Sequence, residues 1–395
     1  MSLGLVGSVL IARWLGPFGR GEYAVALAVA AIAVQLGNLG LHTSSSWAVS
    51  QRPDLAGRLL ANGVLASLTV GLILAVGIRL VTITFPEIVP LPEPLFVLAL
   101  VSIPFSLLYL LALNLLLGLQ RIREYNTLEL ANRLGSVVLL AIAVALGVLT
   151  STLAYVTVLV GTVGAAVTGV IWLLRWSRTV RIDRSVLIEY GRYGVRAYFA
   201  ALFTYLVLRV DLLLVQYLRG SADAGLYSVA VGLADMLNLL PVVVGTLLFP
   251  RLSAERDAVV AWSIARRAAL LVLGGISVLA LVAAVLSGPA VAVLYGESFE
   301  RSATAFQLLL PGVIFLSVQT VLMHYFYSVG APAVTLYAPL LGTVANLGLN
   351  LILIPKSGIA GASVASTISY GLMLVWSWRA FTNTRPSGAG ALAPP

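Results

Sequence analysis

Cysteine is absent from this chain of 395 residues, and histidine occurs only twice. Disulfides and thiolate chemistry are therefore excluded, and no Cys/His cluster with metal-ligand spacing can form. The sequence also lacks a Walker A phosphate loop and a G-x-S-x-G nucleophile elbow. We therefore expect a protein that is not an enzyme and that carries neither a metal ion nor a cofactor.

Charge is the other scarce property, since only 10% of the residues are charged while 60% are hydrophobic. A helix needs roughly 20 mostly apolar residues to cross the hydrocarbon core of a bilayer. Stretches of about that length follow one another along the whole chain. They predict an all-α integral membrane protein with about 12 transmembrane helices, at residues 3–14, 23–41, 59–81, 95–117, 128–149, 153–174, 195–218, 226–249, 268–286, 306–328, 333–354 and 359–378.

The first of these spans is the shortest, because a Gly16-Pro17 break follows soon after Met1. The short span is explained if the given sequence begins downstream of the native start of the protein, and a tilted first helix is the alternative. We expect the native start to lie upstream, so that the first helix is truncated here. No small-residue cleavage pattern follows the apolar stretch, which is therefore expected to stay in the protein.

Basic residues are distributed unequally between the loops. If the N-terminus is cytoplasmic, the loops after even-numbered spans and the C-terminal tail hold most of the 24 Lys and Arg residues. This asymmetry predicts that both termini are cytoplasmic in a protein of the cytoplasmic (inner) cell membrane. Topology and anionic membrane lipids then account for the net charge of +9, so nucleic-acid binding is not expected.

A short sequence pattern occurs twice, 204 positions apart, and Gly21 and Gly225 are equivalent residues of its two copies. Six predicted spans separate the copies, which favours two six-helix lobes of equal orientation, as in transporters built from parallel repeats. Chance similarity between two turns is the alternative. We expect an N-lobe at 1–174, a basic cytoplasmic linker at 175–194, a C-lobe at 195–380 and a cytoplasmic tail at 381–395. The matching pairs are Gly16 and Gly220, Gly21 and Gly225, Tyr23 and Tyr227, Val25 and Val229, Ala26 and Ala230, and Ala30 and Ala234.

Four segments together carry a family resemblance. Residues 12–17 read Ala-Arg-Trp-Leu-Gly-Pro, 19–23 read Gly-Arg-Gly-Glu-Tyr, 209–211 read Arg-Val-Asp and 358–363 read Gly-Ile-Ala-Gly-Ala-Ser. In this order they resemble bacterial flippases of polysaccharide and O-antigen units, in the multidrug, oligosaccharidyl-lipid and polysaccharide exporter superfamily. The resemblance covers nearly the whole chain and departs from the family where the inner half of the first helix is missing.

The resemblance implies a flippase that moves oligosaccharides linked to polyprenyl pyrophosphate across the cytoplasmic membrane for polysaccharide biosynthesis. Alternating access of two lobes would drive the transfer, and other polysaccharide-assembly proteins are the expected partners. One alternative is a cation-coupled exporter of drugs or metabolites from the same superfamily, although an arginine-bearing cavity argues against cationic drugs. Another is a membrane-embedded polysaccharide polymerase or ligase, against which the short outer loops argue.

Arg209 and Asp211 stand near the middle of the seventh predicted span, where each charge costs roughly 2.5–3.5 kcal/mol. Two positions apart, they point about 200° away from each other on a helix. Tyr198 and Tyr205 share the face of Arg209, which we expect to bind anionic substrate in a central cavity. The alternative is that Arg209 pairs with an acid on a neighbouring helix, with Asp235 as the leading candidate.

The other candidates are polar residues within or beside spans. Asp235 and Asn238 follow a small and polar stripe that is either a cavity wall or a helix-packing face. Asn346 and Asn350, four positions apart, either contact sugars or bind neighbouring helices. The substrate-binding candidates are thus Arg13, Arg196, Tyr198, Tyr205, Arg209, Asn238, Asn346 and Asn350, the arginines offsetting the phosphates, and the ion-coupling candidates are Asp211 and Asp235.

Overall fold

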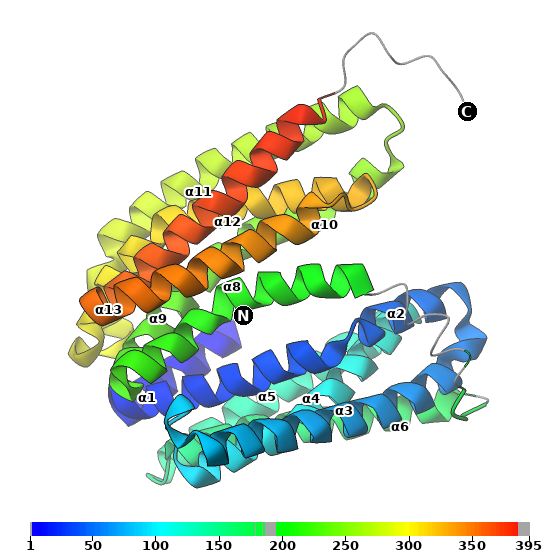
Figure 1. Cartoon of the computed structure of the whole chain (residues 1–395). Helices are drawn as coiled ribbons and strands as arrows, with labels where there is room; N and C mark the ends of the chain where they lie inside the picture. Colours follow the sequence, from blue (N-terminus) through cyan, green and yellow to red (C-terminus); the bar gives the residue numbers. More distant parts are fainter. Residues whose placement is uncertain (1, 178, 184, 186–194, 386–395) are drawn as a thin grey trace. The chain divides into compact units, whose positions relative to one another are not determined.

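The computed structural model describes residues 2–177, 179–183, 185 and 195–385. All regular elements in these ranges are helices, and no strand occurs among them. An apolar medium explains this, because each backbone N–H and C=O group there must find its partner within the chain, and a helix provides one for each. Figure 1 shows the elements in sequence colours.

The helices succeed one another with short connections. Three are single turns of 3-10 helix, named η1, η2 and η3. In chain order the elements are α1 Ser2–Asn38, α2 Leu41–Gln51, η1 Pro53–Leu55, α3 Ala56–Thr84, η2 Pro86–Ile88, α4 Glu93–Gly118, α5 Ile122–Ala145, α6 Ser151–Trp176, α8 Val195–Arg219, α9 Ser221–Leu237, α10 Leu239–Ala254, α11 Ala258–Tyr295, η3 Glu297–Phe299, α12 Glu300–Ser328 and α13 Val334–Asn383.

Ten helical segments within the described ranges are long and apolar enough to cross a membrane, and two of them double back. In α1 the turn is at Gly16, with φ 63°, and in α13 it is at Gly358, with φ 57°, a backbone region that favours glycine. Leu3 and Leu27 line one cavity, although a straight helix would hold them about 36 Å apart. Two arms each in α1 and α13 bring the apolar segments to the twelve that the sequence predicts.

The chain forms two compact units, and each is described by itself. Unit 1 comprises Met1–Tyr205 and Arg219–Gly225, and unit 2 comprises Leu206–Leu218 and Leu226–Pro395. The N-lobe and C-lobe boundaries predicted from the sequence stay a prediction. Of the predicted linker and tail, residues 178, 184, 186–194 and 386–395 lie outside the described ranges.

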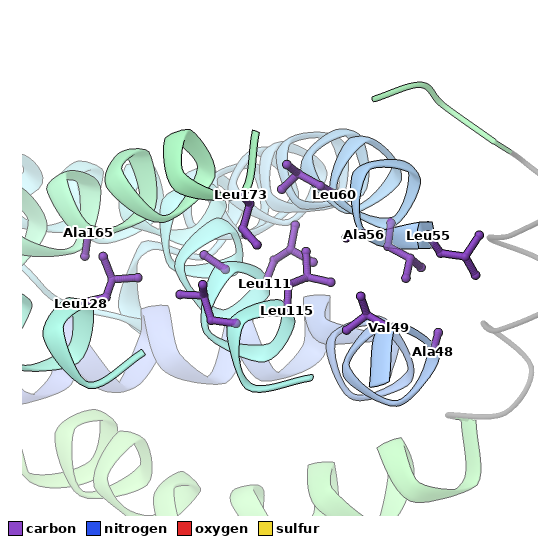
Figure 2. Packing of buried hydrophobic residues seen from close by; sticks show 13 residues of the cluster. Ala48, Val49, Leu55, Ala56, Leu60, Leu111, Leu115, Leu128, Ala165 and Leu173 are labelled. Atoms are coloured by element: carbon purple, nitrogen blue, oxygen red, sulfur yellow. The ribbon is translucent and has the colours of Figure 1, made fainter. Parts of the chain in front are cut away.

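Unit 1 is held together by a buried cluster in which five helices and the η1 turn contribute small and branched apolar side chains. Between helices in lipid, close packing supplies the attraction, because the surrounding lipid tails are as apolar as leucine. Figure 2 shows how these side chains point toward one another from α2, η1, α3, α4, α5 and α6. The labelled members are Ala48, Val49, Leu55, Ala56, Leu60, Leu111, Leu115, Leu128, Ala165 and Leu173.

Unit 2 has a smaller buried cluster of Val207, Leu316, Tyr370 and Met373, from α8, α12 and the second arm of α13. The eighth predicted span, 226–249, is not one regular helix, because α9 ends at Leu237 and α10 begins at Leu239. Asn238, one of the predicted substrate-binding residues, stands between the two helices. The helix is therefore interrupted at a polar residue.

The two copies of the repeated pattern contact each other within unit 1. A Cβ atom on Gly21 would overlap the carbonyl oxygen of Ser221, and one on Gly225 would overlap that of Pro17. Ser221 stands 204 positions after Pro17, as Gly225 does after Gly21. The contact is therefore reciprocal, as expected where two equivalent segments cross about a twofold axis.

We expect Gly21→Ala to lower the free energy of unfolding by about 1–3 kcal/mol, because the added methyl group meets backbone that cannot rotate away. Gly77→Ala is the matched control, since a Cβ there would meet no other part of the described chain within 4 Å. In that open helical position alanine adds stability of about 0.5–1 kcal/mol. Thermal unfolding in detergent measures both changes, and equal midpoints for the two variants would contradict the close crossing.

Candidate functional site

Arg209 on α8 and Asp235 on α9 form an ion pair inside unit 2. The Nη2–Oδ2 distance is 2.7 Å, and the side chains are 32% and 45% exposed. The sequence predicts this pairing as the alternative to direct substrate binding, and the structure brings the two residues together. Pairing offsets much of the cost of each charge in an apolar span. Because both side chains stay partly exposed, the pair remains open to a competing ion.

Asp235 and Asn238 also line a small cavity of about 20 Å³, together with Asp211 and Tyr370. That volume holds about one water molecule or a small ion. Asn238 occupies the break between α9 and α10, and its buried Oδ1 atom has no hydrogen-bond partner in the described part of the chain. Three of the lining residues, Asp211, Asp235 and Asn238, carry acceptor oxygens, and most of the others are apolar.

Asp211 is 2% exposed and lies at the centre of a hydrogen-bond network. Its carboxylate accepts from the Tyr227 hydroxyl at 2.5 Å, from Ser366 Oγ at 3.1 Å and from the Leu212 N–H at 2.8 Å. A buried carboxylate needs such donors, because water no longer solvates it. The network therefore fixes α8, α9 and the second arm of α13 to one another.

Asn346 and Asn350 extend the same network along the first arm of α13. Asn346 Nδ2 donates to Ser366 Oγ at 3.1 Å, and Asn350 Nδ2 donates to Asn346 Oδ1 at 2.8 Å. Both side chains are 0% exposed. Their position favours the helix-binding alternative of the sequence analysis, and a direct contact with sugars stays a prediction.

The remaining predicted residues belong to unit 1. Tyr198 donates its hydroxyl to the Leu36 carbonyl at 2.9 Å. Tyr205 lines a cavity of about 300 Å³ in unit 1, Arg13 is exposed on the first arm of α1, and the Arg196 side chain lies outside the described residues. These four belong to unit 1, whereas Arg209 belongs to unit 2.

Sequence reasoning missed several polar residues of unit 1. Glu22 is buried and accepts a hydrogen bond from Ser151 Oγ at 2.6 Å. Arg20, equally buried, lines a cavity of about 340 Å³ with Tyr23 and Asn132. The available signal was the Arg-Gly-Glu-Tyr sequence itself, which indicates a turn and the family resemblance but assigns no role to Arg20 or Glu22. Among the described residues no group of three or more His, Cys, Asp or Glu could hold a metal ion.

Comparison with known proteins identifies related sequences. A family model described as polysaccharide biosynthesis protein matches residues 1–255. The chain is 27% identical over 194 residues to the uncharacterized membrane protein MJ1068 of Methanocaldococcus jannaschii, covering 48% of this chain and 38% of the relative. It is 27% identical over 176 residues to the probable flippase AglR of Haloferax volcanii, covering 43% and 37%. The matches thus span well under half of these relatives' lengths.

Solved structures share the fold along almost the whole chain. The inward closed lipid II flippase MurJ aligns with a TM-score of 0.72 at 12% identity, over 97% of this chain and 87% of that one. An inward-facing multidrug resistance transporter of the MATE family, in the MOP superfamily, aligns with a TM-score of 0.76 at 13% identity, over 98% and 96%. The all-α membrane fold expected from the sequence is confirmed, and the chain is a multi-pass membrane protein.

We expect Tyr227→Phe to destabilise the protein by about 1–3 kcal/mol, because the buried Asp211 carboxylate would lose its shortest hydrogen bond. Ser366→Ala acts on the same carboxylate, so the double variant should differ from the sum of the single effects. Ser50→Ala is the control, since its exposed hydroxyl bonds only to the Trp47 carbonyl. Thermal unfolding in detergent measures all four variants, and a Tyr227→Phe midpoint equal to that of wild type would contradict the network.

Proposed function

Because the chain belongs to the family of polysaccharide biosynthesis proteins, we propose that it flips oligosaccharide units linked to polyprenyl pyrophosphate. Transfer runs from the cytoplasmic to the outer leaflet of the cytoplasmic membrane, with both termini in the cytoplasm. The family match supports a role in polysaccharide biosynthesis, and the flippase and transporter folds support transport as the activity. Catalysis has no part in this proposal.

The ion pair of Arg209 and Asp235 is the observation that carries the substrate assignment. A guanidinium group offers a planar fork of N–H donors that matches a phosphate, and it keeps its charge at any pH in a protein. In the proposed cycle the pyrophosphate displaces the partly exposed Asp235 carboxylate from Arg209. The carboxylate thus occupies the anion position while substrate is absent, which lowers the cost of an empty cationic site.

Displacement would also give Asp235 a role in coupling. Once separated from Arg209, the carboxylate has to take up a proton or a cation, since an unpaired charge in an apolar span is costly. Asn238 lines the same small cavity, and its buried Oδ1, which has no hydrogen-bond partner in the described part of the chain, is a second oxygen that an ion could use. Asp211 has a different role in this account, because its three donors hold it in place.

A cation-coupled exporter is the second candidate, and the structural likeness to a multidrug resistance transporter of the MATE family favours it. In that case Asp235 would bind the exported cation or the coupling ion, and Arg209 would regulate the binding of that ion by competing for the Asp235 carboxylate. The candidates differ in the charge of the transported molecule. A polyprenyl-pyrophosphate substrate is anionic, and other polysaccharide-assembly proteins would supply it and receive the product.

Arg209→Gln should reduce flipping in proteoliposomes about tenfold or more, because hydrogen bonds to a charged group contribute about 1.5–3 kcal/mol each. Arg209→Lys should retain part of the activity, since it restores the charge without the planar fork. Arg79→Gln is the matched control, because Arg79 forms an exposed pair with Glu93 in unit 1. It should flip the substrate at the rate of wild type.

A double variant separates the two roles of the pair. If Arg209 binds substrate, Arg209→Gln combined with Asp235→Asn stays as inactive as Arg209→Gln alone. If the pair serves only folding, removing both charges together relieves the unpaired carboxylate and restores flipping. Restored flipping would therefore refute the substrate assignment.

The proposed topology can be tested with single cysteines, because the chain has none of its own. Ser50 and Ala222 are both exposed, and the predicted spans place them on opposite sides. In intact cells a membrane-impermeant maleimide should label Ala222→Cys, and Ser50→Cys should react only after permeabilisation. Labelling of Ser50→Cys from outside would overturn the assignment of the termini to the cytoplasm.

A further inference from the structure

An aromatic cluster joins two helix ends in unit 2. Trp262, in the second turn of α11, stacks on Phe381 near the end of α13, with ring centroids 5.1 Å apart and planes 8° from parallel. The Trp262 Nε1–H donates to the Phe381 carbonyl at 3.0 Å. Tyr325 of α12 meets Phe381 edge-on, at 5.0 Å and 87°. The indole is therefore fixed in orientation, and its one hydrogen-bond donor is used inside the protein.

Two arginines approach this one ring. The guanidinium carbon of Arg266 lies 5.7 Å from the Trp262 centroid, and that of Arg385 lies 5.6 Å from it. Each cation is attracted by the ring, but because both lie within about 6 Å of the same centroid their like charges also repel each other. Both side chains are exposed. An anion bound between them would turn this repulsion into attraction.

The surrounding residues add positive charge. Arg267 and Arg379 are exposed on the same two helices. The structure gives none of these four arginines an ion pair in the part of the chain that it describes. The nearest acid along the chain, Asp257, caps α11 by accepting from two of its N–H groups. The protein itself therefore leaves the cluster with excess positive charge.

Apolar surface continues from the cluster along both helices. Leu270 and Leu271 on α11 are 46% and 76% exposed, two to three turns from Trp262. Val375 and Trp376 on α13 are each 51% exposed, less than two turns from Phe381. Exposed apolar side chains on membrane-spanning helices are typical of a lipid-facing surface. A molecule that binds at the arginines with a charged end therefore finds apolar surface for its tails on the same two helices.

We propose that Trp262, Arg266 and Arg385 form a binding site for the headgroup of an anionic phospholipid. The phosphodiester lies between the two guanidinium groups, each of which can donate two parallel hydrogen bonds to phosphate oxygens. The acyl chains lie along the exposed apolar side chains of α11 and α13. Bound lipid ties the start of α11 to the end of α13 and so stabilises unit 2.

Native mass spectrometry of the delipidated full chain tests the site, with phosphatidylglycerol and phosphatidylcholine as the two lipids. We expect saturable binding of phosphatidylglycerol and a much weaker response to the zwitterionic lipid. Arg266→Gln with Arg385→Gln should bind phosphatidylglycerol about tenfold more weakly for each arginine lost. Lysine at both positions should keep part of the affinity, which separates charge from folding.

Arg123→Gln with Arg175→Gln is the matched control, since it removes two exposed arginines from unit 1. This control should bind phosphatidylglycerol like wild type. If the control and the Arg266, Arg385 variant lose equal affinity for phosphatidylglycerol, the effect comes from the overall positive charge of the protein, and the proposed site is wrong. Undiminished binding by the Arg266, Arg385 variant would do the same. Competition by inorganic phosphate as strong as by the lipid would refute the assignment to a phospholipid.

Discussion

Every backbone polar group of a chain that lies in hydrocarbon must find a partner within the chain, and a buried charge needs a partner as well; this constraint explains most of the structure. It leaves helices as the backbone of every span. It also accounts for the hydrogen-bonded Asp211 carboxylate and for the pairing of Arg209 with Asp235. These two sites answer the same requirement in different ways. The first is buried and surrounded by donors, whereas the second is partly exposed and can exchange its partner.

The two units use polar residues differently. In unit 2 the polar groups of α8, α9 and α13 bond to one another beside a cavity of about 20 Å³. Unit 1 contains cavities of about 340 and 300 Å³, which share Leu27, Val158 and Thr162 in their walls. Unit 2 thus contributes an ion pair whose partners are partly exposed, and unit 1 contributes the larger of these cavities.

The fold class could be predicted from composition and the length of the apolar stretches, because these quantities decide whether a helix can span the membrane. The partner of Arg209 could be proposed as well, since few acids occur within the spans. The sequence could not show whether Asn346 and Asn350 face a cavity or another helix. Helix rotation depends on packing against neighbours, and the spacing of two residues on one face does not reveal what that face contacts.

Other features depend on residues far apart in the sequence. Glu22 and Ser151 are 129 positions apart, and Trp262 and Phe381 are 119 positions apart. A local sequence pattern therefore cannot predict either contact. The sequence repeat identifies Gly21 and Gly225 as equivalent positions. That each of them packs against the segment of the other is seen only in the folded structure. Thus local patterns predicted the elements, and the tertiary structure decided which of their polar residues meet.

The measurement that tests the account most directly compares two substrates in proteoliposomes containing the purified chain. The same oligosaccharide is attached to a polyprenyl pyrophosphate and to a polyprenyl monophosphate, and transfer between leaflets is followed. Recognition of phosphate by the planar fork of Arg209 predicts faster transfer of the pyrophosphate-linked glycan, because the second phosphate adds charge and acceptor oxygens. Equal rates for the two carriers, or no transfer of either above protein-free liposomes, would contradict the account.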